Sequence, residues 1–185
     1  MEKFKFVKTP IEGLIIIELT VFKDERGFFM ESYNYRDFKQ GGIDVNFVQD
    51  NHSKSQKGVL RGLHFQKQHP QGKLVRVIKG KVFDVAVDIR KGSPTFGKWF
   101  GVELSEANKK QFYIPPGFAH GFLTLENNTE FLYKCTDYYY PDEEGGIIWN
   151  DSTINIKWPL EKIDKLLISD KDKLLPTFEE VVRCL

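Results

Sequence analysis

The sequence predicts an all-β fold, a sandwich or barrel of short strands with a few short helices at its edges. Short runs of β-branched and aromatic residues recur along the chain with turn residues between them, which is typical of such folds. Residues 81–90 (KVFDVAVDIR) also alternate, with Phe83, Val85 and Val87 on one face and the residues between them on the other. Aromatic residues form 14% of the 185 residues, a content that favours a folded, strand-rich body over a disordered chain.

The remaining elements follow from local signals. Residues 35–42 (YRDFKQGG) are predicted to form a short helix that ends at Gly41 or Gly42. KGK at residues 79–81 indicates a tight hairpin, and residues 159–182 have the charged and apolar spacing of a helix. The predicted strands are residues 14–22, which the turn DERG follows, and residues 28–34, 45–55 (running into a polar loop), 59–66, 73–80, 81–90, 99–105, 111–117, 121–127 and 130–141.

Length and composition narrow the class of protein. We expect one domain over residues 1–185, with a C-terminal helical extension from about residue 160. A net charge of +1 provides no strong field for nucleic acid or membranes, so neither is expected as a partner. The start, MEKFKFVKTP, lacks the apolar run of a signal peptide, and no run approaches the length of a membrane helix. Cys135 and Cys184 have no CxxC partners, so we expect a protein of the reducing cytoplasm.

Polar residues recur on strand faces that should otherwise be apolar. Any one of them is most simply interpreted as facing solvent at a sheet edge. Together they indicate a polar-lined cavity. The sets that share a face are Gly62, His64 and Gln66; Lys73, Val75 and Val77; Val82, Asp84 and Ala86; and Tyr133, Asp137 and Tyr139.

The residues around His64 are similar to the first metal motif of the cupins, a superfamily of small β-barrels. That motif runs from a glycine to two histidines and then a glutamate. Gly58 and His64 match it, but Gln66 replaces the second histidine and Lys73 stands in place of the glutamate. The second cupin motif has a counterpart in PPGFAH, which supplies a further histidine. The resemblance implies a cupin-type β-barrel, or jelly roll, with a few short peripheral helices.

The substitutions argue against the metal that this motif usually holds. An ammonium group repels a divalent cation and offers it no lone pair. We therefore expect no metal, and a cationic centre that can stabilise an oxyanion through Lys73.

Longer stretches resemble the dTDP-4-dehydrorhamnose 3,5-epimerase family. They are DERGFFMESYN, FVQDNHSKS, VLRGLHFQ, QGKLVRVIKGKVFDVAVDIRKGSPTFGKW, IPPGFAHGFLTLE, EFLYKCTDYYYP and GGIIWND, in the family's order. The resemblance implies an isomerase of dTDP-L-rhamnose biosynthesis that inverts C3 and C5 of dTDP-4-dehydro-6-deoxy-D-glucose to give dTDP-4-dehydro-L-rhamnose. Both carbons adjoin the C4 ketone, so their protons are weakly acidic, and the chemistry needs a base and an acid but no metal or redox cofactor.

The resemblance also implies catalytic roles. His64 resembles the family's base, and Tyr133 resembles the acid on the opposite face of the sugar. Asp172 resembles the carboxylate that orients the base, with Asp170 as the alternative if the register slips by two. Lys73 resembles the residue that steadies the C4 enolate oxygen.

Further residues resemble substrate contacts. The guanidinium groups of Arg26 and Arg61 suit a diphosphate. Arg61 and His64 have opposite strand parity, so either Gly62 marks a bulge that re-aims Arg61 or Arg61 serves another face. The other implied contacts are Glu31, Gln49, Asn51, His120, Tyr139, Glu144, Lys171, Phe29 (which, like Phe28, would stack on the base or pack near it) and Asp84, either a buried polar partner of the site or a salt-bridge partner of Lys73.

The resemblance implies a homodimer that exchanges an N-terminal segment across its interface. Three alternatives remain open. Relatives with the same base and acid epimerise only C3 or only C5 of related dTDP-4-keto-6-deoxy sugars. A non-catalytic cupin-like module would bind the sugar nucleotide without converting it. A metal-dependent cupin enzyme would contain stoichiometric metal.

Overall fold

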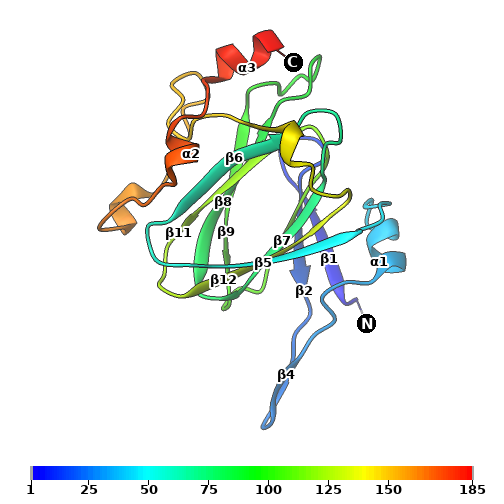
Figure 1. The fold of residues 1–185 in the computed structure, drawn as a ribbon. Helices are drawn as coiled ribbons and strands as arrows, with labels where there is room; N and C mark the ends of the chain where they lie inside the picture. Colours follow the sequence, from blue (N-terminus) through cyan, green and yellow to red (C-terminus); the bar gives the residue numbers. More distant parts are fainter. Residues whose placement is uncertain (1, 185) are drawn as a thin grey trace.

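Two antiparallel sheets face each other around the interior of a barrel (Figure 1). The computed structural model describes residues 2–184, and strands dominate them, as predicted. The strands are β1 (Phe4–Lys8), β2 (Ile15–Leu19), β3 (Phe22–Asp24), β4 (Gly27–Phe29), β5 (Gln49–Ser55), β6 (Leu60–Gln66), β7 (Lys73–Lys79), β8 (Lys81–Asp88), β9 (Trp99–Ser105), β10 (Gln111–Ile114), β11 (Phe118–Thr124), β12 (Thr129–Cys135) and β13 (Glu144–Gly146). The helices are α1 (Tyr35–Gln40), α2 (Asp170–Lys173) and α3 (Phe178–Cys184), with 3₁₀ turns η1 (Pro141–Glu143) and η2 (Leu160–Lys162).

The two sheets divide the apolar residues into three layers. The six-stranded sheet has the order β1-β2-β10-β7-β12-β5, and the five-stranded sheet has the order β13-β6-β11-β8-β9. Apolar side chains of β7, β10 and β12 meet those of β8, β9 and β11 inside the barrel. The C-terminal residues cover the outer face of the five-stranded sheet, and the N-terminal strands and α1 cover part of the other. Both faces of the central strands are therefore buried.

Strand β8 shows how the alternating pattern works. Val85 and Val87 join the outer layer, whereas Val82 and Ala86 face the barrel interior, as the period of two predicted. Asp84 also belongs to the inner face and is fully buried, so a charged group enters the barrel. The polar-lined interior that the sequence indicated thus exists on this strand.

The hairpin predicted at residues 79–81 is wrong. Strand β7 pairs with β10 and β12, whereas β8 pairs with β9 and β11. Gly80, with a φ of +76°, turns the chain from one sheet to the other. Turn residues mark a change of direction, but they do not say which strand becomes the neighbour.

Several predicted boundaries also move. The helix predicted over residues 35–42 is confirmed as α1. It begins after Asn34 because the Asn34 side chain accepts hydrogen bonds from the amides of Arg36 and Asp37 in the first turn. Strand β4 ends at Phe29, so the strand predicted over residues 28–34 is wrong beyond that point. Three predicted strands are broken or shifted: residues 14–22 divide between β2 and β3, β11 begins at Phe118 rather than at 121, and β12 ends at Cys135 rather than at 141.

Two assignments from sequence are changed by tertiary contacts. Within the strand predicted over residues 45–55, which was expected to run into a polar loop, residues 49–55 form strand β5, because β12 supplies a partner along the whole of that length. Residues 159–182 contain only η2, α2 and the start of α3. Apolar residues of this tail pack on the barrel, and Leu167 forms a parallel bridge with Val59. The bridge requires an extended backbone, so this part of the tail is not helical.

A buried carboxylate organises the loop after β8. Asp88 accepts hydrogen bonds from Arg90 Nε at 2.9 Å, Arg90 Nη2 at 2.7 Å, and the hydroxyls of Ser93 and Thr95 at 2.6 Å each. Burial alone would raise the pKa of Asp88, but these donors outweigh it and hold the pKa well below its usual range.

Asp88→Asn should lower the free energy of unfolding by about 2 kcal/mol at pH 7, because the half-buried guanidinium of Arg90 loses its counter-charge and two hydroxyls lose a charged acceptor. The pKa of Asp88 is lower in the folded protein than in the unfolded chain, where it is about 4. The stabilisation is therefore fully present above about pH 4 and is lost as the pH falls from there toward the folded pKa. Urea unfolding of both proteins at pH 7 and pH 3 measures it. A difference that does not shrink at pH 3 would contradict the assignment.

Candidate active site

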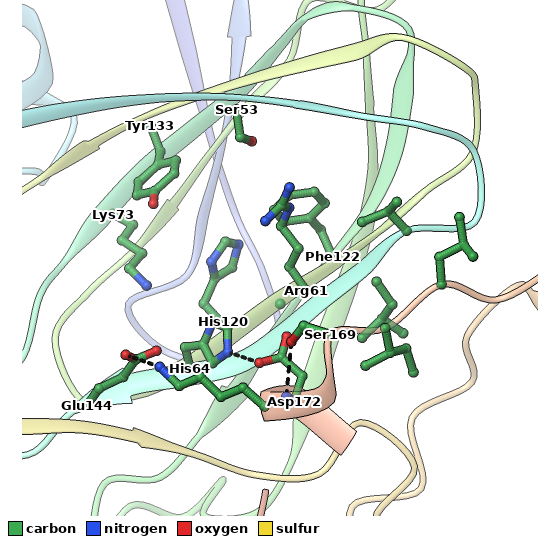
Figure 2. A pocket seen from close by; sticks show the side chains of 16 residues that line it. Ser53, Arg61, His64, Lys73, His120, Phe122, Tyr133, Glu144, Ser169 and Asp172 are labelled. Atoms are coloured by element: carbon green, nitrogen blue, oxygen red, sulfur yellow. Dashed lines mark hydrogen bonds and ion pairs between the residues drawn. The ribbon is translucent and has the colours of Figure 1, made fainter. Parts of the chain in front are cut away.

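A cavity of about 500 Å³ lies at one end of the barrel, between the two sheets and the C-terminal tail (Figure 2). Its volume is within the usual range for a small-molecule site. Polar side chains come from all three parts of the fold. They include the predicted residues Arg61, His64, Lys73, His120, Tyr133, Glu144, Lys171 and Asp172, together with Ser53 and Ser169.

Strand β6 brings Arg61 and His64 to the same cavity although their parities differ. On the neighbouring strand, His120 pairs with His64 and Phe122 pairs with Arg61, so three steps on β6 oppose two on β11. This irregularity is the bulge that Gly62 was predicted to mark. Gly62 has a φ of +112°, and a Cβ atom there would lie 2.6 Å from the carbonyl oxygen of His120. Only glycine fits this position.

The C-terminal tail delivers Asp172 to His64. Leu167 donates to the carbonyl of Gly58, and Leu60 donates to the carbonyl of Leu167, which fastens the tail to β6. A Cβ atom at Gly58 would overlap the backbone oxygen of Lys165, so this glycine permits the crossing. Ser169 then caps α2, which carries Asp172.

His64 and Asp172 form a hydrogen-bonded pair. The distance from His64 Nε2 to Asp172 Oδ1 is 2.8 Å, and Gly62 N donates to Asp172 Oδ2 at 3.2 Å. Burial would raise the pKa of Asp172, but its bonds to His64 and Gly62 lower the pKa further than burial raises it. An ionised Asp172 therefore accepts the Nε2 proton, and His64 Nδ1 has no hydrogen-bond partner among residues 2–184. Asp170, the alternative, is exposed and bonds to Lys173 instead.

Tyr133 and Lys73 come from the facing sheet. Figure 2 shows the phenol and the amine pointing into the cavity from the side opposite His64. In the part of the chain that the structure describes, Lys73 makes no ion pair with a carboxylate. Burial lowers the pKa of Lys73, and Asp84 and Glu144 partly oppose this. Burial raises the pKa of Tyr133, so its hydroxyl stays protonated at neutral pH.

His120 lies between these two walls and is held from behind by Asp84. The distances from His120 Nε2 to the two Asp84 oxygens are 3.1 and 2.9 Å, and both residues are buried. Burial lowers the pKa of His120 and raises the pKa of Asp84, although each opposes the shift in the other. Asp84 therefore pairs with His120, and the salt bridge to Lys73 considered as an alternative is not formed.

A second polar group forms the rim. Glu144 accepts hydrogen bonds from Tyr139 Oη at 2.7 Å and from Lys171 Nζ at 2.5 Å. Burial would raise the pKa of Glu144, but these two donors outweigh it and lower the pKa. Tyr139 is half exposed and does not itself line the cavity, but its bond to the lining residue Glu144 holds its hydroxyl at the cavity's edge.

Two cations of the cavity lack a carboxylate partner in the described part of the chain. Lys171 is paired with Glu144, but Arg61 bonds only to Ser55 Oγ, at 3.3 Å, and Lys73 has no partner. Both carboxylates of the cavity are engaged elsewhere, Asp172 with His64 and Glu144 with the rim. The cavity therefore suits an anionic ligand.

Strand β5 places Gln49 and Asn51 on the cavity side of the sheet. The register pairs Gln49 with Cys135, Asn51 with Tyr133, and Ser53 with Phe131, and directly paired residues share a face. Ser53 was missed by sequence reasoning, although it lies in the segment predicted as a strand over residues 45–55 and shares a parity with Gln49 and Asn51. Its buried hydroxyl has no hydrogen-bond partner in residues 2–184, and a ligand hydroxyl could provide one.

Three predicted contacts lie away from this cavity. Arg26 and Phe29 belong to the β3–β4 hairpin, which projects from the barrel (Figure 1). Glu31 bonds to Lys3 and Asn34 near the N-terminus. Within one chain, these residues do not join the site.

The donor set does not resemble a metal centre. Within residues 2–184, no three histidine, cysteine, aspartate or glutamate side chains gather to hold an ion. Gln66, at the position of a cupin metal ligand, uses its side chain to bond backbone groups. Nor does this part of the chain contain a helix of the length and apolarity needed to span a membrane.

Comparison with known proteins identifies the family of this chain. The sequence profile described as dTDP-4-dehydrorhamnose 3,5-epimerase matches residues 8–180. The chain belongs to the dTDP-4-dehydrorhamnose 3,5-epimerase family. A curated relative of that name from Methanothermobacter thermautotrophicus is 57% identical over 173 residues, which cover 94% of each chain.

Solved structures of relatives have the same fold. The dTDP-6-deoxy-D-glucose-3,5-epimerase of Legionella pneumophila, in complex with dTDP-4-keto-L-rhamnose, has a TM-score of 0.91 and 52% identity over 95% of this chain and 93% of that one. A 3'-monoepimerase of Streptomyces bikiniensis, in complex with dTDP-quinovose, has a TM-score of 0.87 and 32% identity over 95% and 89%. The predicted cupin-type jelly roll is confirmed.

If Asp172 orients His64, Asp172→Asn should lower kcat at least about 100-fold, because an amide can present N–H to the ring and favour the wrong tautomer. Affinity for dTDP should change less than about twofold, since Arg61 and the rim are untouched. Steady-state kinetics and calorimetry measure the two effects. Asp170→Asn is the matched control and should behave as wild type. Equal losses in both variants would contradict the role of Asp172.

Proposed function

We propose that this protein is a dTDP-4-dehydrorhamnose 3,5-epimerase that inverts C3 and C5 of dTDP-4-dehydro-6-deoxy-D-glucose by general acid–base catalysis, in dTDP-L-rhamnose biosynthesis. One observation carries the proposal. An oriented histidine and a protonated tyrosine enter a cationic cavity from opposite sheets. A base and an acid on opposite sides of a sugar ring are what inversion at a carbon requires.

The base is His64. Because Asp172 accepts the Nε2 proton, Nδ1 carries the lone pair that removes the proton from C3 or C5. The electron pair of the broken C–H bond moves into the C3–C4 or C4–C5 bond, and the C4 carbonyl becomes an enolate. The charge that develops on His64 is stabilised by Asp172 at 2.8 Å.

Lys73 stabilises the enolate oxygen. Its ammonium group has no carboxylate partner among residues 2–184, so its charge is available to the substrate. Lys73 is partly desolvated, since burial lowers its pKa, and this strengthens the interaction as negative charge develops at O4. In the cupin motif this position holds a metal-binding glutamate, and here the ammonium group of Lys73 supplies the positive charge.

Tyr133 returns a proton to the face opposite His64, which inverts the carbon. Its phenol is in the donating form at neutral pH, since burial raises the pKa. The proton leaves Tyr133 as the enolate collapses to the ketone. Exchange of Tyr133 and His64 with solvent then restores both groups for the second carbon.

The nucleotide extends along the rim. Arg61 binds the diphosphate with its unpaired guanidinium fork. Tyr139 offers a half-exposed ring on which thymine stacks, and Lys171 and Glu144 flank it. Gln49 and Asn51 line the wall behind the sugar and base. His120, backed by Asp84, completes the binding of the sugar.

A second copy of the chain completes the site, so the protein acts as a homodimer. The β3–β4 hairpin projects from the barrel with Phe22, Phe28 and Phe29 exposed by 41%, 56% and 70%. Such apolar exposure supports burial against a partner. Arg26, at the hairpin turn of one protomer, then joins the partner subunit's Arg61 around the diphosphate in the partner's site. Phe29 and Glu31 of the same protomer as Arg26 contact the nucleotide there. The reaction is assigned to the cytoplasm, in keeping with two unpaired thiols.

Proton NMR in deuterated water tests the proposal. The enzyme is mixed with dTDP-4-dehydro-6-deoxy-D-glucose, and deuterium is followed at C3 and C5. Incorporation at both carbons, with NADPH consumption when a rhamnose-forming reductase is added, is the expected result. Incorporation at one carbon would instead support a monoepimerase, the activity that the name of the Streptomyces bikiniensis relative states. Absence of exchange with dTDP still bound would contradict the proposal and favour a binding module.

Tyr133→Phe should lower net epimerisation by about 10²–10⁴-fold, the usual contribution of a general acid. Deuterium wash-in should fall much less, because His64 still forms the enolate and can return a deuteron to the same face. NMR measures both rates in one sample. Tyr35→Phe, on α1, is the control. Equal loss of wash-in and epimerisation would show that Tyr133 does not act as a separate acid.

Sharing of sites between chains predicts complementation. Arg26→Ala and His64→Ala chains, co-expressed with different tags, should recover about a quarter of wild-type activity, because half of the dimers are mixed and each has one intact site. Co-expression of Lys73→Ala with His64→Ala should recover nothing, since every site then lacks one group. Recovery in neither pair would contradict the contribution of the hairpin to the partner's site.

A further inference from the structure

We infer that Gln66 is a positioning residue that holds Tyr139 ready for the nucleotide base. The inference rests on the proposed function and deepens it. Gln66 occupies the position of a cupin metal ligand, ends strand β6 two residues after His64, and is 6% exposed. Its carboxamide does not coordinate anything in the cavity, so the question is what this buried polar group does.

The Gln66 side chain bonds the backbone on both sides of Tyr139. Gln66 Nε2 donates to the carbonyl of Tyr138 at 3.1 Å, and Gln66 Oε1 accepts from the amide of Tyr140 at 2.9 Å. The second Nε2 proton is donated to the carbonyl of His69 at 2.7 Å. Both donors and one lone pair of the carboxamide are therefore used.

Tyr139, the residue between these two bonds, is fixed at both ends. Its amide donates to Gln49 Oε1 at 3.0 Å, and its hydroxyl donates to Glu144 Oε2 at 2.7 Å. The residue as a whole nevertheless stays 50% exposed. A half-exposed aromatic side chain that is anchored at its backbone and its tip is preorganised for stacking and loses little entropy when a base binds.

The same carboxamide joins two loops at the rim. His69, whose carbonyl accepts from Gln66, stacks on Tyr140 with ring centroids 4.4 Å apart, and its Nδ1 lies 2.7 Å from Glu143 Oε1. Residues 136–143 lie outside the two large sheets. The position of Tyr139 therefore depends on side-chain bonds, with Gln66 at their centre.

This geometry separates binding from chemistry. His64 lies on β6, which pairs with β11, and Tyr133 lies on β12, which pairs with β5. Their positions therefore do not depend on the loop. Loss of the Gln66 bonds leaves Tyr139 held only by its own bonds to Gln49 and Glu144, so its ring becomes more mobile. The cost then falls on nucleotide affinity and KM, and much less on kcat.

The test uses the full-length protein and dTDP itself as the probe. Gln66→Met keeps the length of the side chain but removes its three hydrogen bonds. Calorimetry should show about tenfold weaker dTDP binding, and KM for the keto sugar should rise by a similar factor while kcat falls less than about threefold. Gln66→Glu keeps the acceptor for Tyr140 but sets a carboxylate oxygen against two carbonyls, so it should not rescue affinity. Gln56→Met, an exposed glutamine bonded to Asn128, is the control.

A double-mutant cycle distinguishes positioning from general structural damage. In a Tyr139→Leu background, Gln66→Met should weaken dTDP binding less than about twofold, because the ring that Gln66 holds is absent. An equal effect in both backgrounds, or a lower melting temperature with unchanged dTDP affinity, would overturn the inference. If wild-type protein epimerises but Gln66→Met binds dTDP normally, the inference alone fails. If wild-type protein does not bind dTDP, the proposed function fails with it.

Discussion

The hydrogen bond between Asp172 and His64 joins the C-terminal tail to the barrel, and the candidate site depends on it. The two residues are 108 positions apart, and the carboxylate is almost completely buried. A buried carboxylate remains charged only where donors compensate its desolvation, and here the donors are the His64 ring and the Gly62 amide. The same contact therefore orders the tail, orients the imidazole and closes one side of the cavity.

The barrel also explains why cations can replace a metal in this site. Lys73 and Arg61 enter a cavity whose two carboxylates are already engaged, so their charge is directed at the ligand. Gln66, the other departure from the cupin motif, faces the loops at the rim. One strand, β6, thus supplies the proposed base His64, the cation Arg61 and Gln66, and the bulge at Gly62 brings His64 and Arg61, which alternation would place on opposite faces, to one cavity.

Local sequence patterns predicted the strands well but not their partners. The alternation in residues 81–90 established two faces of β8, and the glycines at 41 and 42 predicted where α1 ends. The error at residues 79–81 arose because a glycine turn inside a hairpin and one that crosses between sheets have the same local signal. Of the strand predicted over residues 45–55, only the polar residues 49–55 form β5, because pairing with β12 rather than apolar side chains stabilises it.

The site could be predicted in its chemistry but only partly in its geometry. The cavity residues from His64 to Asp172 came from motif resemblance, and the structure brings most of them together. The pairing of Asp84 with His120 could not be read from sequence, since the strand register decides it. The resemblance named Arg26 and Phe29 as site residues, but within one chain they lie away from the cavity, because the hairpin that carries them projects from the barrel.

The protonation of His64 tests the central claim most directly. The chain has only four histidines, so ¹⁵N-resolved NMR of the imidazole rings at about pH 8.5, with His64→Gln for assignment, can identify each ring. The account predicts that neutral His64 carries its proton on Nε2, hydrogen-bonded to Asp172, with Nδ1 unprotonated. A proton on Nδ1 would remove the lone pair from the catalytic position and contradict the assignment of His64 as the oriented base.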